Sequence, residues 1–412
     1  MKFNTALLHD NFKSDLSTGA TVMPIYQVSA FSHDSPETLE KIFNNRAPGF
    51  AYSRISNPTV DSFEKRIASL ENGIGAVACS SGMAAVTMSL LNILKSDDEV
   101  IAGSGLFGGT IDLFGDLKPF GITAKFVNSF TAEEIEPLIT DKTKAIFTEL
   151  IGNPRLDIVD IESVSALAHK HSIPLVIDST TATPYLIHPI DYGADIVVHS
   201  SSKYINGSGN AISGVIIDSG NFKWDEKKYD FVKEYKRYGK FAYLAKLRNG
   251  IWRNVGCCLA PMNAFLNTIG LETLGLRMER LCDNALQLAE FLDSFDSIEV
   301  NYPALPDSKY YPLTKKQLGG KGGAILTIRT GSKERAFRLM NNLKIPLVAT
   351  NIGDVRTLVI HPASTIYAHS SDEQKINAGV YEDTIRISIG IEDIEDLKDD
   401  FKQAIEKSEE EK

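Results

Sequence analysis

Two reactive side chains follow apolar runs that are typical of buried strands. The run PLVIDS (174–179) contains Asp178, and the run DIVVHSSSK (195–203) ends in Lys203. Either residue alone has an ordinary explanation, as a turn former or as a surface cation. The carboxyl ends of neighbouring parallel strands meet at one edge of a sheet, however, so we expect this acid and this amine to face one crevice.

A third segment, SSGMAA (80–85), lies between a predicted strand and a predicted helix. A helix that starts there presents free backbone N–H groups and the positive end of its dipole, which favour a phosphate. A lysine, an acid and a phosphate cradle are the parts that pyridoxal phosphate needs. The amine forms a covalent link, and the acid keeps the pyridine nitrogen protonated. The sequence therefore predicts a site for this cofactor.

The elements that must position these residues alternate along the chain. Short apolar runs such as EVIAG (99–103) and KAIFTEL (144–150) are separated by helical stretches, which predicts an α/β fold with a parallel sheet buried on both faces. Beyond Cys257 the pattern changes to one long predicted helix over 263–294 and a smaller sheet. We expect three parts: an extended N-terminal arm at 1–56, a large cofactor-binding domain at 57–258 and a small C-terminal domain at 259–412.

Composition restricts the class of protein. The chain has 412 residues, and its net charge of −10 argues against a nucleic-acid-binding surface. Four cysteines without a CxxC pair argue against a disulfide scaffold or a structural zinc site, and no metal is expected. No apolar run approaches the ~18 residues of a membrane span. The first residues show no secretory pattern, so we expect a cytoplasmic protein.

The segment 219–254 combines ten Lys and Arg with nine aromatic residues. Such a mixture could bind nucleic acid, but the rest of the chain is strongly acidic. We therefore expect a lid or a subunit contact in this segment.

The motifs together resemble one family. The sequence is similar, from about Tyr26 to Leu397, to the fold type I pyridoxal-phosphate enzymes of Cys/Met metabolism. The resemblance rests on YSRISNPT (52–59), SSGMAA, GLFGGT (105–110), GNP (152–154), PLVIDST, DIVVHSSSK, GLETLGLRMER (270–280) and TIRISIGIED (384–393). It implies a mostly parallel seven-stranded sheet flanked by helices, with a smaller C-terminal α/β domain. NIGDVRTLVIHPAST (351–365), DEQKINAGV (372–380) and the long segment before Cys257 are most similar to the O-acetylhomoserine sulfhydrylase branch.

The resemblance assigns roles residue by residue. Lys203 corresponds to the Schiff-base lysine, and Asp178 to the partner of the pyridine nitrogen. The other expected cofactor contacts are Asn153 at the phenolic oxygen, Thr180 under the ring, Phe107 stacked on the ring, and Gly82, Met83, Ser200 and Ser202 at the phosphate. Asn351 and Arg386 correspond to the residues that bind the substrate carboxylate. Glu149 corresponds to a family acid near the site, whose role stays open.

Tyr52 and Arg54 correspond to a pair that reaches the phosphate of the neighbouring subunit. An arginine fork suits a phosphate well. The resemblance thus implies an obligate dimer, and a homotetramer built from two such dimers.

Three positions bear on the reaction. Phe107 stands where the family usually has Tyr, so ring stacking survives while a phenol that could carry a proton is lost. A weakly basic leaving group such as acetate tolerates that loss best. Asn351 stands where many relatives have Ser, and its amide can still donate to a carboxylate. Gly109 stands where methionine γ-lyases usually have Cys.

The implied activity is a γ-replacement in sulfur amino-acid biosynthesis. An activated homoserine, expected to be O-acetylhomoserine, reacts with sulfide or a thiol to give homocysteine or methionine and acetate. A cystathionine γ-synthase or γ-lyase, or a methionine γ-lyase, shares nearly all these residues and remains an alternative. A cofactor-binding regulator would carry a DNA-binding module, and the sequence pattern predicts no helix-turn-helix extension at either end. A Rossmann dehydrogenase would need GxGxxG, and SSGMAA is not that motif.

Overall fold

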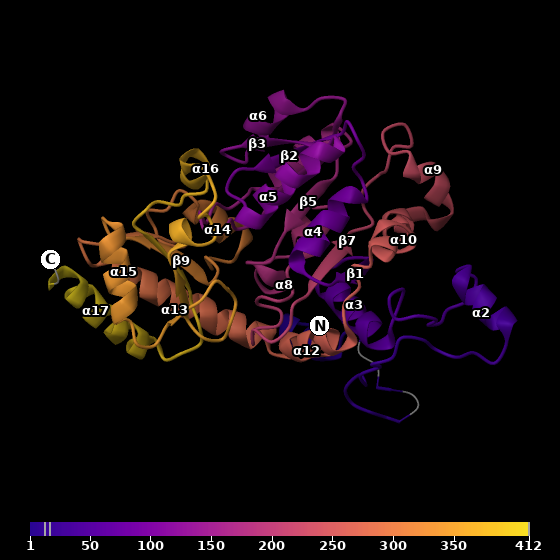
Figure 1. Ribbon diagram of the computed structural model, residues 1–412, viewed down its shortest axis with the longest axis horizontal. Helices are drawn as coiled ribbons and strands as arrows, with labels where there is room; N and C mark the ends of the chain where they lie inside the picture. Colours follow the sequence, from indigo (N-terminus) through magenta and orange to yellow (C-terminus); the bar gives the residue numbers. More distant parts are fainter. Residues whose placement is uncertain (12–13, 16–17, 411–412) are drawn as a thin grey trace.

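The computed structural model describes residues 1–11, 14–15 and 18–410. Two sheets follow one another along the chain (Figure 1). The larger sheet has seven strands in the order β1-β7-β6-β5-β4-β2-β3. Its strands are β1 Gly75–Cys79, β2 Glu99–Gly103, β3 Thr123–Val127, β4 Thr143–Glu149, β5 Leu175–Asp178, β6 Ile196–His199 and β7 Gly214–Asp218.

The pairing within this sheet confirms the predicted fold class. β7 runs antiparallel to both of its neighbours, β1 and β6, and the remaining pairs are parallel. In the register of β4 with β5, Glu149 lies beside Asp178, and Asp178 in turn lies beside Val198 of β6. The carboxyl ends of three parallel strands thus present their last residues at one edge.

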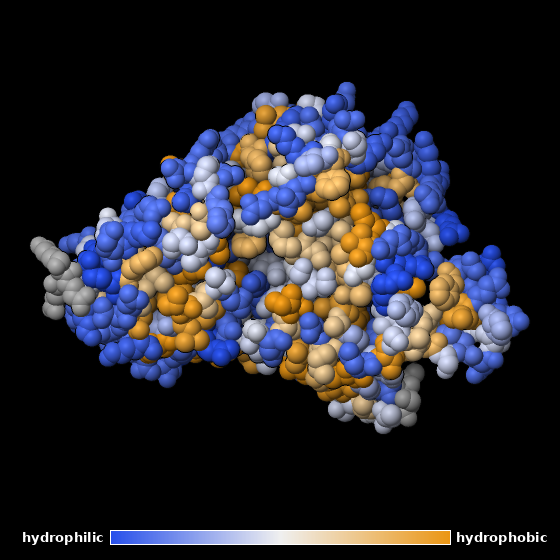
Figure 2. Space-filling view, viewed as in Figure 1, coloured by the Kyte–Doolittle hydropathy of each residue, from blue (hydrophilic) through white to orange (hydrophobic). Residues whose placement is uncertain are grey.

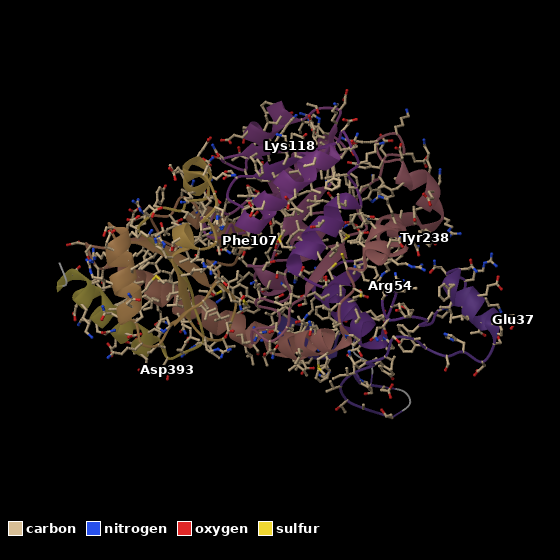
Figure 3. The ribbon with its side chains drawn as sticks, viewed as in Figure 1. Glu37, Arg54, Phe107, Lys118, Tyr238 and Asp393 are labelled. Atoms are coloured by element: carbon tan, nitrogen blue, oxygen red, sulfur yellow. The ribbon has the colours of Figure 1, made fainter. Side chains whose placement is uncertain are left out.

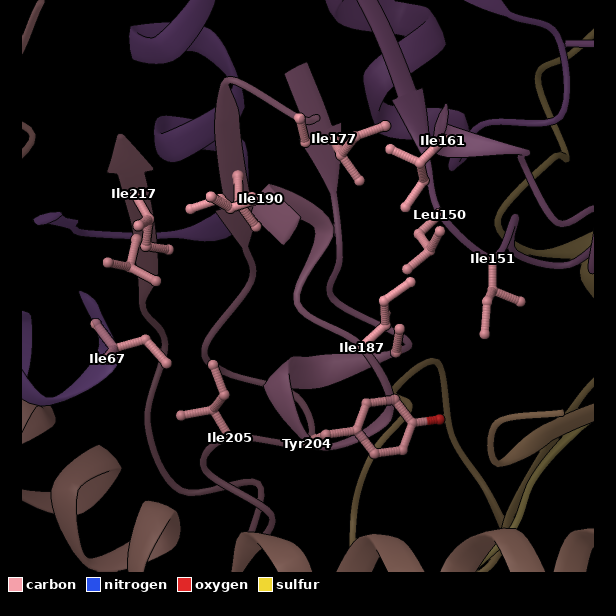
Figure 4. Close-up of a cluster of buried hydrophobic side chains, with 14 of the residues drawn as sticks. Ile67, Leu150, Ile151, Ile161, Ile177, Ile187, Ile190, Tyr204, Ile205 and Ile217 are labelled. Atoms are coloured by element: carbon pink, nitrogen blue, oxygen red, sulfur yellow. The ribbon is translucent and has the colours of Figure 1, made fainter. Parts of the chain in front are cut away.

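Both faces of the larger sheet are buried, as the continuously apolar strands predicted. Ile146, Ile177 and Ile217 point into one cluster, part of which is drawn in Figure 4. Phe147 and Val176 point into a second cluster on the opposite face. The helices associated with this part of the chain are α3 Pro58–Leu70, α4 Gly82–Leu91, α5 Gly108–Leu117, α6 Ala132–Ile135, α7 Ile161–Lys170, α8 Thr183–Leu186, α9 Phe231–Tyr235, α10 Ala242–Asn249 and α11 Ile251–Val255.

The second sheet has five strands in the order β10-β11-β12-β9-β8. They are β8 Glu299–Asn301, β9 Ile325–Arg329, β10 Leu347–Val348, β11 Leu358–Ile360 and β12 Thr384–Ser388. The helices in this later part of the chain are α12 Pro261–Glu272, α13 Leu274–Asp293, α14 Tyr311–Gln317, α15 Lys333–Asn342, α16 Asp372–Asn377 and α17 Ile394–Glu410. Of these, α12 packs on α3. The predicted smaller α/β unit is therefore present.

The prediction of a single long helix over 263–294 was wrong. The chain leaves helical geometry at Thr273 (φ −112°, ψ 6°), which separates α12 from α13. The Arg277 guanidinium fills the break by donating to the carbonyl oxygens of Gly270 and Tyr204, both at 2.6 Å. A local apolar period cannot reveal this break, because the stabilising partner lies in a distant loop. That loop directly follows Lys203.

The N-terminal segment also differs from a fully extended arm. It contains two short helices, α1 Phe3–His9 and α2 Pro36–Phe43. α2 projects from the body of the molecule at the right of Figure 1. Its start is specified locally, because Ser35 caps the helix and Pro36 occupies the first helical position.

Aromatic residues of segment 219–254 form part of the protein interior. The Trp224 ring stacks on Tyr243 at 5.6 Å and meets Phe222 and Phe231 edge to face. These rings pack against the second core cluster. Packing in the interior thus accounts for these rings, whereas Phe241 of the same segment is 43% exposed.

Among the described residues, no helix is both long enough and apolar enough to cross a membrane. On the face shown in Figure 2, hydrophilic residues occupy most of the periphery. Hydrophobic residues gather toward the middle, near α4, and along the lower edge, near α12.

Candidate active site

A cavity of about 420 Å³ lies at the carboxyl ends of β4, β5 and β6. Nine of the predicted site residues line it together: Gly82, Met83, Phe107, Asn153, Asp178, Thr180, Ser200, Lys203 and Arg386. These residues span three hundred positions of the sequence. The parallel strand ends bring the first eight together, and β12 of the second sheet supplies Arg386.

Asp178 ends β5 and is fixed by the turn that follows it. Its Oδ1 accepts the backbone N–H of Thr180 at 2.9 Å, and Thr180 Oγ1 accepts the N–H of Ser200 at 2.8 Å. Burial raises the pKa of Asp178, while the hydrogen bonds from Thr180 act in the opposite direction. Thr180 therefore ties the acid to the loop that carries the lysine.

The start of α4 forms a narrow cradle against Ser200. The Ser81 side chain caps the helix by accepting the N–H of Ala84 at 3.0 Å. This cap leaves the N–H groups of Gly82 and Met83 at the first helical positions, where no carbonyl of the helix can accept them. A Cβ at Gly82 would lie 2.5 Å from Ser200 Cβ, so only glycine allows this approach.

Lys203 is half-buried and points at the loop that follows β10 of the second sheet. Its Nζ donates to Asn351 Oδ1 at 2.6 Å. Burial, together with the nearby charge of Arg386, lowers the pKa of Lys203 to about 8. A substantial fraction of this amine is thus neutral near pH 7.5, which is the state that acts as a nucleophile or a base.

Arg386 crosses from the second sheet into the cavity and is only 2% exposed. Its Nη1 donates to Asn153 Oδ1 at 3.2 Å, and its Nη2 donates to the carbonyl oxygen of Asn351 at 3.0 Å. Its buried Nε has no hydrogen-bond partner among the described residues. A guanidinium with an unused donor suits a carboxylate, which accepts charge-assisted hydrogen bonds.

Phe107 precedes α5 and lies between the two sheets, as Figure 3 shows. Its ring rests over Gly109, where a Cβ would lie 2.8 Å from Phe107 Cε1. A cysteine at position 109 would therefore collide with this ring.

Four predicted residues do not line the cavity. Ser202 donates to the carbonyl oxygen of Ser213 at 2.9 Å, which engages its hydroxyl elsewhere. Asn351 contacts the cavity through its bond to Lys203. Tyr52 is 41% exposed, and the exposed Arg54 donates to the carbonyl oxygen of Arg253 at 2.8 Å. Figure 3 places Arg54 well apart from Phe107.

Other lining residues had no assigned role in the sequence analysis. They are Val86, Thr110, Glu149, Thr181, Thr350, Ile352 and Ile366. Most of them lie within or directly beside a motif of the sequence analysis. Thr110, for example, is the last residue of GLFGGT. Ile366 likewise directly follows the motif NIGDVRTLVIHPAST (351–365), and its loop reaches the cavity through tertiary packing.

Comparison with known proteins agrees with this geometry. The sequence matches the family described as Cys/Met metabolism PLP-dependent enzyme over residues 4–406. The chain belongs to this family. The enzyme is 40% identical to a homocysteine synthase of Schizosaccharomyces pombe, with 98% of each chain covered. It is also 40% identical to an O-acetyl-L-homoserine sulfhydrylase of Corynebacterium glutamicum, covering 96% of this chain and 94% of the relative.

A solved structure also resembles the enzyme. It is a Campylobacter jejuni protein assigned as an O-acetylhomoserine (thiol)-lyase, with a pyridoxyl group on a lysine. The TM-score is 0.92 at 35% identity, covering 98% of this chain and all of the other. The predicted fold type and the predicted cofactor, pyridoxal phosphate, are confirmed by these findings.

The cavity of this enzyme fits that cofactor. The approach of α4 to Ser200 depends on glycine and leaves backbone N–H groups for a phosphate. Lys203 offers an amine whose pKa is lowered to about 8. Asp178 offers a carboxylate at the end of a neighbouring strand. The three chemical requirements of the cofactor thus meet within one cavity.

Proposed function

We propose that the enzyme transfers the four-carbon chain of O-acetylhomoserine to sulfide or a thiol. The products are acetate and homocysteine, or methionine when the thiol is methanethiol. The observation that carries this proposal is the 40% identity, over nearly the whole chain, to proteins that are named for this reaction. Phe107, in place of a phenol at the cavity, supports an acyloxy leaving group over a thiolate.

The residues of the enzyme divide the work as follows. Gly82, Met83 and Ser200 would hold the phosphate, and Asp178 would keep the pyridine nitrogen protonated. Pyridoxal phosphate, when bound, supplies the carbonyl that captures the substrate amine and the ring that withdraws electrons from Cα. Arg386 binds the substrate carboxylate and so fixes the orientation of Cα.

Lys203 acts as the base in this proposal. Its Nζ removes the proton from Cα, because a neutral amine with a pKa near 8 accepts a proton readily at neutral pH. A second proton leaves Cβ, the Cγ–O bond breaks as acetate departs, and the sulfur of the sulfide or thiolate forms a new bond to Cγ. Protons then return to Cβ and to Cα, and Lys203 delivers the one at Cα. Asn351 holds Nζ at 2.6 Å and thereby limits where the amine can reach.

Leaving-group preference tests the proposal. We expect kcat/KM for O-acetylhomoserine with sulfide to exceed that for cystathionine by at least about a hundredfold, because a positioned general acid contributes on this scale. Thr110 and Thr350 place hydroxyls at the cavity, but an alcohol is a far weaker acid than a phenol. Phe107→Tyr is expected to lower the ratio of kcat/KM for O-acetylhomoserine to kcat/KM for cystathionine about tenfold, because the added phenol can protonate the departing thiolate.

Phe107→Leu is the matched control, since it removes the ring without adding a hydroxyl. This variant should lower kcat/KM for both O-acetylhomoserine and cystathionine and leave the ratio of the two values unchanged. O-succinylhomoserine and O-phosphohomoserine, assayed in parallel, are expected to be poorer substrates. The proposal would be falsified by elimination from cystathionine at the rate of O-acetylhomoserine turnover, or by product formation that does not depend on sulfide.

We also propose that the active unit is a dimer, two of which form a tetramer. In this assembly residues 1–56 act as the arm that reaches the neighbouring subunit, 57–258 hold the cofactor and 259–412 close the substrate side. Tyr52 and Arg54 support this arrangement. They are exposed and outside the cavity of their own subunit, although their chemistry suits a phosphate.

Subunit mixing tests the shared site. Arg54→Ala and Lys203→Ala are each expected to be nearly inactive alone. A mixed dimer has one site with both native residues, so full exchange should restore up to about a quarter of wild-type activity. Exchange is measured independently with differently tagged subunits. Complete exchange without any recovery would place Arg54 in the site of its own subunit.

A further inference from the structure

Glu149 makes two hydrogen bonds that the reaction outlined above does not use. It ends β4, lies beside Asp178 in the register and lines the cavity. Its Oε1 accepts the backbone N–H of Phe107 at 2.6 Å, and its Oε2 accepts the backbone N–H of Asn153 at 3.1 Å. One carboxylate thus joins the loop after β2 to the loop after β4.

The two loops approach each other without side chains between them. A Cβ at Gly152 would lie 2.9 Å from the carbonyl oxygen of Gly105, so the backbones are nearly in contact. On the other side of the first loop, the Tyr367 hydroxyl donates to the carbonyl oxygen of Leu106 at 3.0 Å. The position of Phe107 is therefore set by polar contacts to the backbone around it.

The second loop continues this connection across the cavity. Asn153 Oδ1 accepts from Arg386, whose Nη2 donates to the carbonyl of Asn351, and Asn351 Oδ1 accepts from Lys203. Each hydrogen bond in this path is 3.2 Å or shorter, and within Asn153 and within Asn351 the path runs from the backbone to the side chain of the same residue. The path begins at Glu149.

We propose that Glu149 is a positioning residue. Its carboxyl group fixes the backbone N–H groups of Phe107 and Asn153 relative to each other. Because Arg386 donates to the Asn153 side chain, the position of this arginine relative to the Phe107 ring is fixed as well. The proposal deepens the proposed function and rests on it for its kinetic part. Its structural part concerns the protein's own amides and stands without the reaction.

A carboxyl group is suited to this task because two N–H donors need two acceptors. A glutamine offers one carbonyl oxygen, and its NH2 group would face the second N–H. Burial and the neighbouring Asp178 raise the pKa of Glu149, while the two N–H donors act against that shift. Glu149→Gln therefore tests the loss of one hydrogen bond with little change in volume.

Glu64 provides a matched control. It is 4% exposed, its Oε1 accepts the N–H of Ala78 at 2.7 Å, and its other oxygen accepts from Arg248. It lies on α3 and does not line the cavity. Glu64→Gln makes the same chemical change at another buried carboxylate that binds the backbone.

The first measurement is amide hydrogen exchange on the cofactor-free proteins. In Glu149→Gln, exchange at Phe107 or Asn153 should rise about tenfold, as expected when one local hydrogen bond is lost. Glu64→Gln should leave both amides as in wild type. Unchanged exchange at both amides in Glu149→Gln would overturn the proposal.

The second measurement is steady-state kinetics of the holoenzymes with O-acetylhomoserine and sulfide. Glu149→Gln should lower kcat on the order of tenfold to a hundredfold with a smaller change in KM, because displaced groups reduce the rate more than binding. An equal loss of kcat in Glu64→Gln would assign the effect to general destabilisation and contradict the proposal. Glu149→Asp, with a shorter reach, is the second variant if Glu149→Gln does not fold.

The two measurements separate the two proposals. If wild type turns over another substrate, the proposed function fails, while the exchange result still decides the role of Glu149. If wild type performs the proposed reaction and Glu149→Gln exchanges as wild type does, only the positioning role fails.

Discussion

Lys203→Ala is expected to lower turnover by at least about ten-thousandfold, or roughly 5.4 kcal/mol of barrier at 1.36 kcal/mol per tenfold. The variant loses both the amine that tethers the cofactor and the base that removes the Cα proton. The fold should survive, because Tyr204 and Ile205, which anchor this loop in the core, are unchanged. Steady-state kinetics measures the loss of turnover, and circular dichroism shows whether the fold survives.

Reduction with borohydride tests the site directly. In wild type it should fix the pyridoxyl group on Lys203, which peptide mapping by mass spectrometry identifies. Lys228 is the matched control, because burial also lowers its pKa to about 8 while its Nζ donates to the carbonyl oxygen of His171, outside the cavity. Lys228→Ala should keep near wild-type activity. Label on Lys228 in place of Lys203 would refute the assignment.

The parts of the site that were predictable lie next to strand ends. Asp178 and Lys203 were found because an apolar run marks each strand, and parallel strands deliver their last residues to one edge. The cradle at Gly82 was predicted because SSGMAA lies between a predicted strand and a predicted helix, where the start of a helix can bind a phosphate. Each of these signals is local, so a single sequence can carry it.

The parts that were not predictable depend on contacts between distant segments. Nothing near Glu149 in the sequence indicates that Phe107, 42 positions earlier, donates to its carboxylate. The break at Thr273 is stabilised by the Arg277 bond to Tyr204, 73 positions away. Such contacts arise from the packing of complete elements, and local propensity carries no trace of them.

The resemblance to the family assigned a role to a residue that its local sequence pattern does not single out. Arg386 lies within an ordinary apolar strand pattern, TIRIS, which by itself predicts only a buried strand. Its role was assigned from the family motif, and the structure then placed the buried guanidinium in the cavity. An arginine with an unpartnered buried Nε would be a candidate site residue on structural grounds alone.

Asp178→Asn is expected to retain the cofactor and to lose about a hundredfold to a thousandfold in kcat, the scale of removing one preorganised electrostatic contact. The amide has nearly the same shape, so the bond from the Thr180 N–H to Oδ1 can persist. A neutral amide cannot hold the pyridine nitrogen protonated, however, and the withdrawal of electrons from Cα weakens. Kinetics combined with borohydride labelling of Lys203 separates this loss from a loss of cofactor.

Asp218→Asn is the control that distinguishes this effect from the removal of any buried carboxylate. Asp218 ends β7, which runs antiparallel, so it lies at the opposite edge of the same sheet from Asp178. Burial raises the pKa of Asp218 to about 7, so this residue too is an acid with a disfavoured charge. Its replacement should leave kcat close to wild type, since it touches neither the cavity nor Lys203. A near wild-type rate for Asp178→Asn, or a comparable loss in both variants, would remove Asp178 from the mechanism, because charge at that one strand end is what the proposed reaction requires.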